Sequence, residues 1–315
     1  RLTRAGVAGG PLIIAHRGGA AVRPENTLAA IRHALACGVD GIEVDVHLSA
    51  DGHVVVHHDY RLNPDMTRLA GEWLAGPGPL LRDLSLEAIA PLDVGRPRPG
   101  SDYQVRHPDL VAVDSEPIPT LEAVIDVLKA EAPKARLFVE MKQEPAVHQG
   151  ASDEDALAAA IARLIDTTEF RDRAVVMAFA WSALAALAGH DAAIATGFLT
   201  YPSYLFKDGP LPEHAPPWAD DTRRALRQIT TPATPWASGF DPDTEETAVV
   251  QAIADLGGAY WCPFHLDATP AAVAAAHANG LKVGVWTVNT RQDVRRLTEA
   301  GVDAVTTDYP DILSR

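Results

Sequence analysis

The feature that most constrains this chain is the repeated alternation of short apolar runs with longer segments of helical periodicity. The apolar runs are rich in β-branched and aromatic residues, which favour strands, and they occupy residues 12–16, 41–46, 53–58, 136–141, 174–179, 193–199, 259–264, 282–288 and 303–307. Helices are predicted between them, at residues 26–37, 119–130, 153–166, 181–188, 244–256, 269–279 and 290–299. This order of strands and helices, with continuously apolar strands, predicts a parallel sheet that helices cover on both faces.

The ends of several helical runs carry residues that start or stop helices. Thr120 and Ser152 precede two of the runs and are predicted to cap the amino termini of those helices. Gly38, Gly280 and Gly301 follow three other runs, as expected at helix carboxyl termini. The connections between the predicted helices and strands are therefore short. Eight of the nine predicted strands are expected to close into a (β/α)8 TIM barrel, with one strand left outside it.

One connection is too short to hold a helix. Only "HLSADG" separates the second and third predicted strands, and its Asp51-Gly52 pair is a strong tight-turn signal. An antiparallel hairpin is therefore predicted at this point. It would fold His58 back beside Asp45.

The length of the chain is compatible with one or two domains, and a single TIM-barrel domain is predicted over residues 1–315. Two Pro-rich segments, at about 61–118 and 201–240, interrupt the repeat and are predicted to be loop-like insertions. The second insertion is also rich in aromatic residues. Long loops of this kind are either substrate-binding loops or plain surface insertions, and the sequence leaves both interpretations open.

The net charge of −15 disfavours some classes of partner. Nucleic acids and anionic membrane surfaces require clustered Lys and Arg, so neither is an expected partner. A small anionic substrate remains compatible if a few local cations or a metal ion reverse the field around it. No run of about 18 apolar residues is present, so no integral membrane segment is expected. Nothing in the sequence indicates an oligomeric state.

The expected compartment follows from two observations. The sequence begins at Arg1 instead of Met, and its surface is expected to be acidic. A periplasmic or secreted location is therefore favoured over a cytoplasmic one. The two cysteines, Cys37 and Cys262, have no metal-binding spacing and are expected to behave as small apolar side chains.

Three carboxylates stand near the ends of predicted strands, where reactive groups of a parallel barrel gather. Glu43 and Asp45 are alternate residues of one strand, so their side chains point to the same side, and Glu140 lies at the end of another strand. In an apolar barrel they would repel one another and lose hydration unless a cation lay between them. An all-oxygen ligand set favours Mg²⁺ or Ca²⁺. The alternative is a solvated edge strand, which the apolar neighbours Ile42 and Val44 disfavour.

Two histidines and two cationic residues accompany these carboxylates at strand ends. His16 and Arg17 follow the first predicted strand, and His58 ends the third. Lys142 follows the strand that contains the third carboxylate. Neutral histidine can take or give a proton near pH 7, and Arg or Lys can hold phosphate oxygens. A single histidine at a strand end is commonly structural, but two of them beside a carboxylate cluster predict acid/base chemistry.

Several ordered segments give the chain a resemblance to a known enzyme family. They are "AHRG" with "PENT", "GIEVDVHLSADGHVVVHHD", "VEMK", "VWTVN" and "TDYP". Together they resemble the signature segments of glycerophosphodiester phosphodiesterases, which belong to the broader superfamily of phospholipase-C-like phosphodiesterases. The resemblance extends from about residue 11 to residue 310 and does not cover the two insertions.

The resemblance implies a (β/α)8 barrel that hydrolyses glycerophosphodiesters to glycerol 3-phosphate and an alcohol. By position it implies an acid/base pair, His16 and His58; ligands of one divalent cation, Glu43, Asp45 and Glu140; phosphate contacts, Arg17 and Lys142; and part of the substrate wall, Trp286 of "VWTVN". Glu25 and Asn26 of "PENT" are expected to support the loop after the first strand, with Asn26 capping the helix that follows.

Several alternatives stay open on the sequence. The nucleophile is water or the substrate's own glycerol 2-hydroxyl, and either histidine can be the base. The same machinery can act on lipids, in a lysophospholipase-D-like reaction, because aromatic residues of the second insertion could receive an acyl chain. A barrel that only binds a phosphorylated metabolite or a metal is the alternative outside enzymes. A sphingomyelinase-D-like protein is disfavoured by the "PENT" and "VWTVN" segments.

Overall fold

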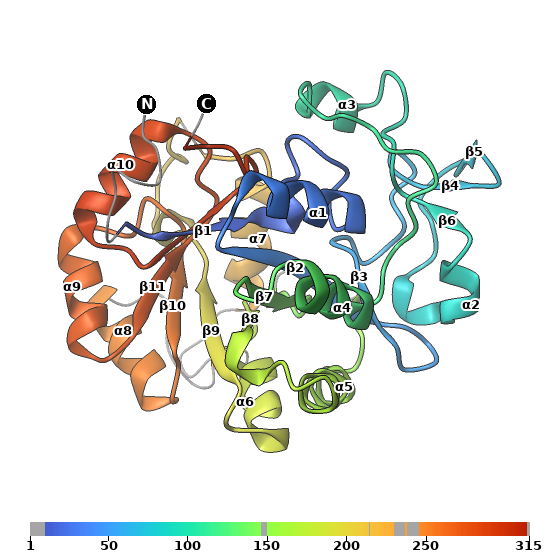
Figure 1. Cartoon of the computed structure of the whole chain (residues 1–315). Helices are drawn as coiled ribbons and strands as arrows, with labels where there is room; N and C mark the ends of the chain where they lie inside the picture. Colours follow the sequence, from blue (N-terminus) through green and yellow to red (C-terminus); the bar gives the residue numbers. More distant parts are fainter. Residues whose placement is uncertain (1–9, 146–149, 214, 230–236, 238–245, 314–315) are drawn as a thin grey trace.

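Eight parallel strands close into a barrel (Figure 1). The computed structural model describes residues 10–145, 150–213, 215–229, 237 and 246–313. The barrel strands are β1 (Leu12–Ala15), β2 (Gly41–Leu48), β7 (Arg136–Met141), β8 (Ala174–Ala178), β9 (Ala195–Thr200), β10 (Tyr260–Pro263), β11 (Lys282–Val285) and β12 (Ala304–Thr307). Strand β1 pairs with both β12 and β2, which closes the ring. The predicted (β/α)8 TIM barrel is confirmed.

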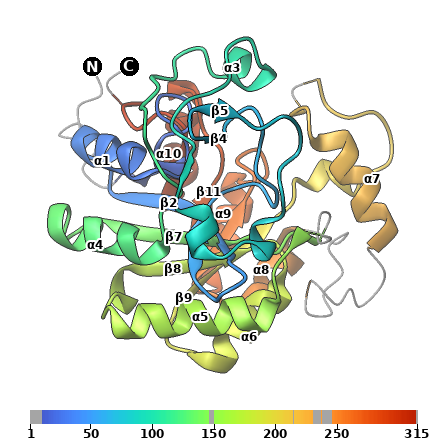
Figure 2. The ribbon, with the colours of Figure 1, turned by 90° about the vertical axis from the view of Figure 1, so that its right-hand side faces the viewer.

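Helices cover the outside of the barrel (Figures 1 and 2). They are α1 (Leu28–Cys37), α4 (Leu121–Glu131), α5 (Glu154–Thr167), α6 (Trp181–His190), α8 (Glu246–Asp255), α9 (Pro270–Ala278) and α10 (Arg291–Ala300). Each corresponds to a predicted helix, with ends that differ by at most two residues. Residues 244 and 245, which the prediction placed in the helix at 244–256, lie outside the described residues.

Alternate residues of the barrel strands face two different environments. On β7, Leu137 and Val139 pack with the surrounding helices, whereas Phe138 belongs to the apolar cluster that fills the barrel interior. Glu140 continues the inward-facing series two residues beyond Phe138, so its carboxylate lies above this apolar filling. Burial on both faces explains why the strands read as continuous apolar runs.

The second and third predicted strands form an antiparallel hairpin, as the sequence predicted. Strand β3 (Val54–Val56) pairs with β2 at the edge of the barrel, with Val56 opposite Val46. The backbone N–H that follows β3, at His57, donates a 3.0 Å hydrogen bond to the carbonyl oxygen of Asp45. The hairpin therefore returns the chain to the carboxyl end of β2, and His58 follows at that point.

The first insertion, residues 61–118, has more regular structure than the predicted loop. It contains a small sheet of β4 (Arg68–Leu69), β5 (Glu72–Trp73) and β6 (Leu92–Asp93), together with the short helices α2 (Leu86–Ile89) and α3 (Asp102–Arg106). Leu62, Leu81 and Ile89 are part of a separate apolar cluster beneath it. Elements of two to five residues are too short to give a periodic signal, which is why the sequence showed only the prolines. In Figures 1 and 2 the insertion lies beside α1 and β3.

The second insertion contains a helix that the sequence analysis did not predict, α7 (Ala219–Ile229). Its buried residues are Ala219, Arg223 and Leu226, which recur at helical spacing. Only two of the three are apolar, so the pattern was weak beside the neighbouring prolines. Asp220 in the first turn and Arg227 in the last are arranged favourably for the helix dipole.

The predicted helix caps were right at one position and wrong at another. The hydroxyl of Thr120 accepts a hydrogen bond from the backbone N–H of Ala123 at the start of α4, as predicted. At α5 the cap is Asp153, whose carboxylate accepts from the N–H of Ala156, and not Ser152. The Ser152 hydroxyl instead accepts a 3.4 Å hydrogen bond from the N–H of Leu48, at the end of β2.

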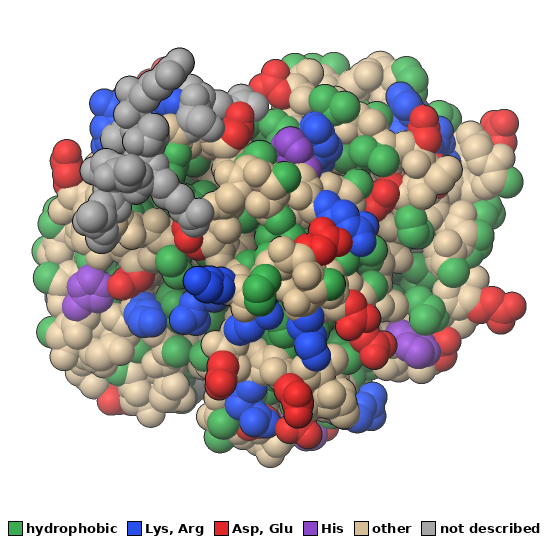
Figure 3. Space-filling model, viewed as in Figure 1, with side chains coloured by type: hydrophobic (Ala, Val, Ile, Leu, Met, Phe, Trp, Pro, Cys, Tyr) green, Lys and Arg blue, Asp and Glu red, His purple; other side chains and the backbone are tan. Residues whose placement is uncertain are grey.

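The outer surface carries both signs of charge. Figure 3 shows acidic and basic side chains interspersed over the face that it presents. Within the described ranges, no helix is long and apolar enough to cross a bilayer.

Replacing the cap of α5 tests the local basis of the fold. Asp153→Ala removes the acceptor for the Ala156 N–H and is expected to lower the free energy of unfolding by about 1 kcal/mol, measured by urea denaturation. Asp126→Ala, on the exposed side of α4, is the matched control, and no loss is expected there because it caps no helix. Equal loss in the two variants would contradict the assigned cap.

Candidate active site

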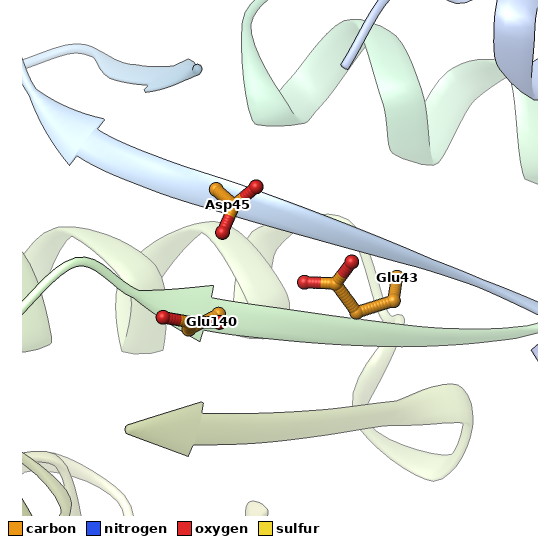
Figure 4. A group of neighbouring side chains, drawn as sticks. All are labelled: Glu43, Asp45 and Glu140. Carbon is orange, nitrogen blue, oxygen red and sulfur yellow. The ribbon is translucent and has the colours of Figure 1, made fainter. Parts of the chain in front are cut away.

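Three carboxylates meet inside the barrel at the ends of two adjacent strands. Glu43 and Asp45 come from β2 and Glu140 comes from β7, with Asp45 directly beside Glu140 in the strand register. One oxygen of each lies within 4.8 Å of the others, and Figure 4 shows the three side chains from the two neighbouring strands. The residues are only 2%, 0% and 8% exposed, so water cannot screen their repulsion.

The electrostatics of this cluster fit a bound cation. Burial, and then the neighbouring Asp45 carboxylate, raises the pKa of Glu43 to about 8. Burial also raises the pKa of Glu140. Glu43 Oε1 and Asp45 Oδ1 are buried and have no hydrogen-bond partner among the described residues. A group of buried carboxylates this close together, with unsatisfied oxygens among them, is the donor set that a hard divalent cation requires.

Arg17 lies beside the cluster in a tight turn after β1. Its backbone is left-handed (φ 51°), and Gly18 and Gly19 follow with φ of 78° and 104°. A Cβ at Gly19 would lie 2.5 Å from Cγ of Pro310, so a glycine is required there. The Arg17 N–H donates to Glu43 Oε2 at 2.9 Å, and its side chain lies 3.2 Å from Asp45 Oδ2. The turn therefore places a guanidinium at the edge of the carboxylate cluster.

Lys142 is buried among carboxylates, with only 2% of its side chain exposed. Its Nζ donates to Glu140 Oε1 at 2.9 Å, lies 3.7 Å from Asp45 Oδ1, and forms an ion pair with Glu144. Burial alone would lower the pKa of Lys142, but these carboxylates raise it well above its usual value. The ammonium group therefore stays charged and offsets part of the negative charge of the cluster.

Asn26 supports the cluster and does not cap a helix, so that expectation was wrong. Thr27 caps α1, and its hydroxyl accepts a hydrogen bond from the N–H of Ala30. The Asn26 side chain turns inward and donates to Asp45 Oδ2 at 2.8 Å, while its own oxygen accepts from the Asp45 N–H at 3.2 Å. Asn26 therefore fixes Asp45 at both its backbone and its carboxylate.

His16 is oriented by residues from the other end of the chain. Its Nδ1 lies 2.6 Å from Asp308 Oδ1, and Asp308 Oδ2 accepts a 2.7 Å hydrogen bond from the Asn289 amide. This arrangement leaves Nε2 facing the cluster, 3.9 Å from Glu43 Oε2. Burial would lower the pKa of His16, but Asp308 reverses the direction and raises it.

His58 has the same arrangement of partners. Its Nδ1 lies 2.7 Å from Asp59 Oδ1, and Asp59 Oδ2 accepts a 3.1 Å hydrogen bond from the Asn63 amide. A carboxylate beside Nδ1 fixes the tautomer that carries its proton there, so Nε2 is the nitrogen left for proton exchange. The two histidines thus share one design, although β1 supplies one and the hairpin supplies the other.

An aromatic pair of the buried His47 and the half-buried Tyr60 supports the backbone at His58. His47 Nε2 donates to the carbonyl oxygen of His58 at 3.1 Å, and its ring packs edge-on against Tyr60 with centroids 5.2 Å apart. Burial lowers the pKa of His47 to about 3, so this imidazole is neutral. The Tyr60 hydroxyl accepts a 3.0 Å hydrogen bond from the N–H of Glu144, which connects the hairpin to the end of β7.

Trp286, the predicted part of a substrate wall, lies in an aromatic group after β11. Its indole N–H donates to the carbonyl oxygen of Cys262 at 3.0 Å, which fixes the plane of the ring. Phe179 and Phe264 both pack edge-on against it, with centroids 5.4 Å away. Trp218 of the second insertion stacks on it at 6.4 Å and is 39% exposed.

Sequence reasoning missed the partners of the two histidines. Asp59 directly follows His58, and Asp308 is the acidic residue of "TDYP", so a carboxylate at a barrel strand end was the available signal. Glu144 gave the same signal two residues after Lys142. The amides of Asn63 and Asn289 gave none, because isolated asparagines are common in loops.

The sequence matches a known protein family over almost its whole length. A model described as "Glycerophosphoryl diester phosphodiesterase family" matches residues 16–312. A glycerophosphodiester phosphodiesterase from Caldanaerobacter subterraneus is 27% identical over 302 residues, which cover 96% of both chains. An enzyme of the same name from Bacillus altitudinis is 25% identical over 299 residues, with 95% of both chains covered.

Solved structures lead to the same group of proteins. A Silicibacter pomeroyi protein, provisionally described as a glycerophosphoryl diester phosphodiesterase, is 31% identical with a TM-score of 0.79, and the match covers 97% of this chain and 92% of that one. A phosphodiesterase from Oleispira antarctica was solved in complex with the product sn-glycerol-3-phosphate and is 24% identical, with a TM-score of 0.63. The match covers 96% of this chain and 95% of that one, and at this identity it shows the fold alone. With the family match spanning the barrel and its site, the chain belongs to the glycerophosphoryl diester phosphodiesterase family, enzymes that hydrolyse glycerophosphodiesters.

Proposed function

We propose that this enzyme hydrolyses glycerophosphodiesters to sn-glycerol 3-phosphate and an alcohol in a metal-dependent reaction with two-histidine acid/base catalysis. The observation that carries the proposal is the buried cluster of Glu43, Asp45 and Glu140, with unsatisfied oxygens, beside two histidines oriented by aspartates. The product complex of the Oleispira antarctica relative supports the choice of product. A barrel that only binds a phosphorylated metabolite would not need both histidine–aspartate pairs.

Glu43, Asp45 and Glu140 would hold one divalent cation, Mg²⁺ or Ca²⁺, because the set consists of carboxylate oxygens alone. When bound, such a cation supplies charge neutralisation and Lewis-acid polarisation of phosphate oxygens. Arg17 is the proposed protein contact to a phosphate oxygen, since its guanidinium lies at the edge of the cluster. Lys142 is the proposed second phosphate contact, with its charge shared with Glu140.

The two histidines are proposed to exchange protons through Nε2. One takes the proton of the attacking hydroxyl, and the other gives a proton to the leaving alkoxide. Asp308 and Asp59 hold the Nδ1–H of each ring and stabilise the imidazolium that forms. Trp286 is proposed to hold the substrate in place with its ring face. The attacking hydroxyl belongs to water or to the substrate's own glycerol, and the proposal accommodates both.

Removal of the metal provides the first test. Release of glycerol 3-phosphate from glycerophosphocholine, followed with a coupled dehydrogenase, is expected to stop with EDTA and to resume when Mg²⁺ or Ca²⁺ is restored. At a metal concentration 100-fold above Kd, the ion is also expected to stabilise the enzyme by roughly 2.7 kcal/mol, seen as a Tm several degrees higher.

Glu43→Gln is expected to abolish the rise in Tm that the metal causes, because it removes one of the three ligand carboxylates. Without metal, this variant is expected to unfold at no lower temperature than the wild type, since a buried repulsion is relieved. Glu154→Gln, on α5, is the matched control and should keep the full rise. A normal metal response in Glu43→Gln would exclude this site.

Replacement of the histidines tests the acid/base proposal. His16→Ala and His58→Ala are each expected to lower kcat by about 10²-fold or more, because each removes a proton carrier. His190→Ala, which removes a histidine paired with Asp155 on the surface, is the control and should leave kcat unchanged. Near-normal kcat in either site variant would remove that residue from the mechanism.

A p-nitrophenyl diester of glycerol phosphate assigns the two roles. Its phenolate leaves without protonation, so the variant without the general acid should retain far more activity on this substrate than the variant without the base. Equal losses in both variants would contradict the division of roles.

A lysophospholipase-D-like activity is the second candidate function, and the aromatic group around Trp286 favours it. Trp218, stacked on Trp286 and partly exposed, is the residue placed to contact an acyl chain. If lipids are substrates, Trp218→Ala should lower kcat/KM for lysophosphatidylcholine about ten-fold, because the acyl chain loses its contact with the aromatic ring. The kcat/KM for glycerophosphocholine, which has no acyl chain, should change less than two-fold. Equal changes for the two substrates would count against an acyl-chain site.

A further inference from the structure

The first insertion makes three contacts with the loop between β1 and α1 and with the first turn of α1. The pairs are Val111 N–H to the Val22 carbonyl at 3.1 Å, Ala29 N–H to Glu116 Oε1 at 2.9 Å, and the Tyr103 hydroxyl to Glu25 Oε2 at 2.6 Å. The first two contacts hold the backbone on either side of Glu25, one in the loop and one in the first turn of α1. The third reaches a side chain of the site, because Glu25 Oε1 accepts a 3.1 Å hydrogen bond from Arg17.

Tyr103 is well placed to hold Glu25. The residue is 7% exposed, and a short hydrogen bond from a hydroxyl to a carboxylate is stronger than one between neutral groups. Its ring stacks on His107 with centroids 4.2 Å apart, and the His107 ring nitrogen Nδ1 lies 2.9 Å from the Tyr103 carbonyl oxygen. The ring of Tyr103 is therefore supported from within the first insertion, by the residue that ends α3.

The position of Arg17 depends on a balance between two carboxylates. Its guanidinium lies between Glu25 and the cluster residue Asp45, and 19% of the side chain is exposed. Of these two carboxylates, Glu25 is the one that lies outside the cluster of Glu43, Asp45 and Glu140. If Glu25 were free to turn, Arg17 would shift toward Asp45 and the other cluster carboxylates, where an ion pair would compete with phosphate and with the cation.

We propose that Tyr103 is a positioning residue that holds Glu25 and, through it, the Arg17 guanidinium in the orientation that receives a phosphate oxygen. This inference rests on the phosphate-binding role proposed above for Arg17. It gives the first insertion a part in catalysis, although Tyr103 itself touches no reacting atom.

The test is Tyr103→Phe, which keeps the ring and its stacking on His107. The expected result is a kcat/KM for glycerophosphocholine about ten-fold lower and an inhibition constant of inorganic phosphate raised by a similar factor, with Tm unchanged. Tyr260→Phe, at the start of β10 and so at the opposite end of the barrel, is the matched control and should change neither constant. Unchanged constants in Tyr103→Phe would overturn the proposal.

A double-mutant cycle tests the route through Glu25. In a Glu25→Gln background, Tyr103→Phe should change the phosphate inhibition constant less than two-fold, because the carboxylate that it orients is gone. A full ten-fold effect in that background would show that Tyr103 acts by another path and would overturn the proposal.

Calorimetric titration of phosphate, with Mg²⁺ or Ca²⁺ present, separates failure of this inference from failure of the proposed function. If phosphate binds but no glycerophosphodiester is hydrolysed, the proposed function fails, and the affinities of wild type and Tyr103→Phe still decide the role of Tyr103. If phosphate does not bind to the wild type, the role of Arg17 fails and this inference fails with it.

Discussion

The mutual repulsion of three buried carboxylates is the interaction on which the rest of the site depends. One oxygen of each of Glu43, Asp45 and Glu140 lies within 4.8 Å of the others, above an apolar barrel interior where burial penalises their charges. Arg17, Lys142 and Asn26 are arranged around them so that each carboxylate keeps at least one compensating contact. Glu43 Oε1 and Asp45 Oδ1 remain without a hydrogen-bond partner among the described residues, and the cation proposed for this site would relieve that cost in stability.

Around this centre the protein uses one arrangement twice, and this arrangement suits the proton transfer proposed for the two histidines. Each histidine has an aspartate beside Nδ1, and each aspartate is fixed by an asparagine amide. Rings held in this way present Nε2 without reorganisation, which keeps the geometry constant through the reaction. In the mechanism proposed above, the acid and the base would therefore be chemically similar groups, and the position of the substrate would decide which histidine takes which role.

Much of this arrangement could be predicted from the sequence, because it depends on the order of strands. The barrel, the hairpin and the gathering of the three carboxylates follow from alternation and from the rule that strand ends meet. Contacts between side chains could not be predicted in the same way. From the sequence alone, Asn26 could have capped α1, and only the structure shows that the neighbouring Thr27 is the cap. Tyr103 lies 78 residues from Glu25 within a segment whose short elements carry no periodic signal.

The pairing of His16 with Asp308 joins residues 292 positions apart, from the first and last strands of the barrel. Between them the chain supplies other parts of the site in turn, from β2, the hairpin, β7 and the segment after β11. No partial barrel can therefore contain a finished active centre. During synthesis on the ribosome, the growing chain would remain without an oriented His16 until the last barrel strand and Asp308 had emerged. With the role proposed for His16, phosphodiester cleavage would begin only once the ring is complete.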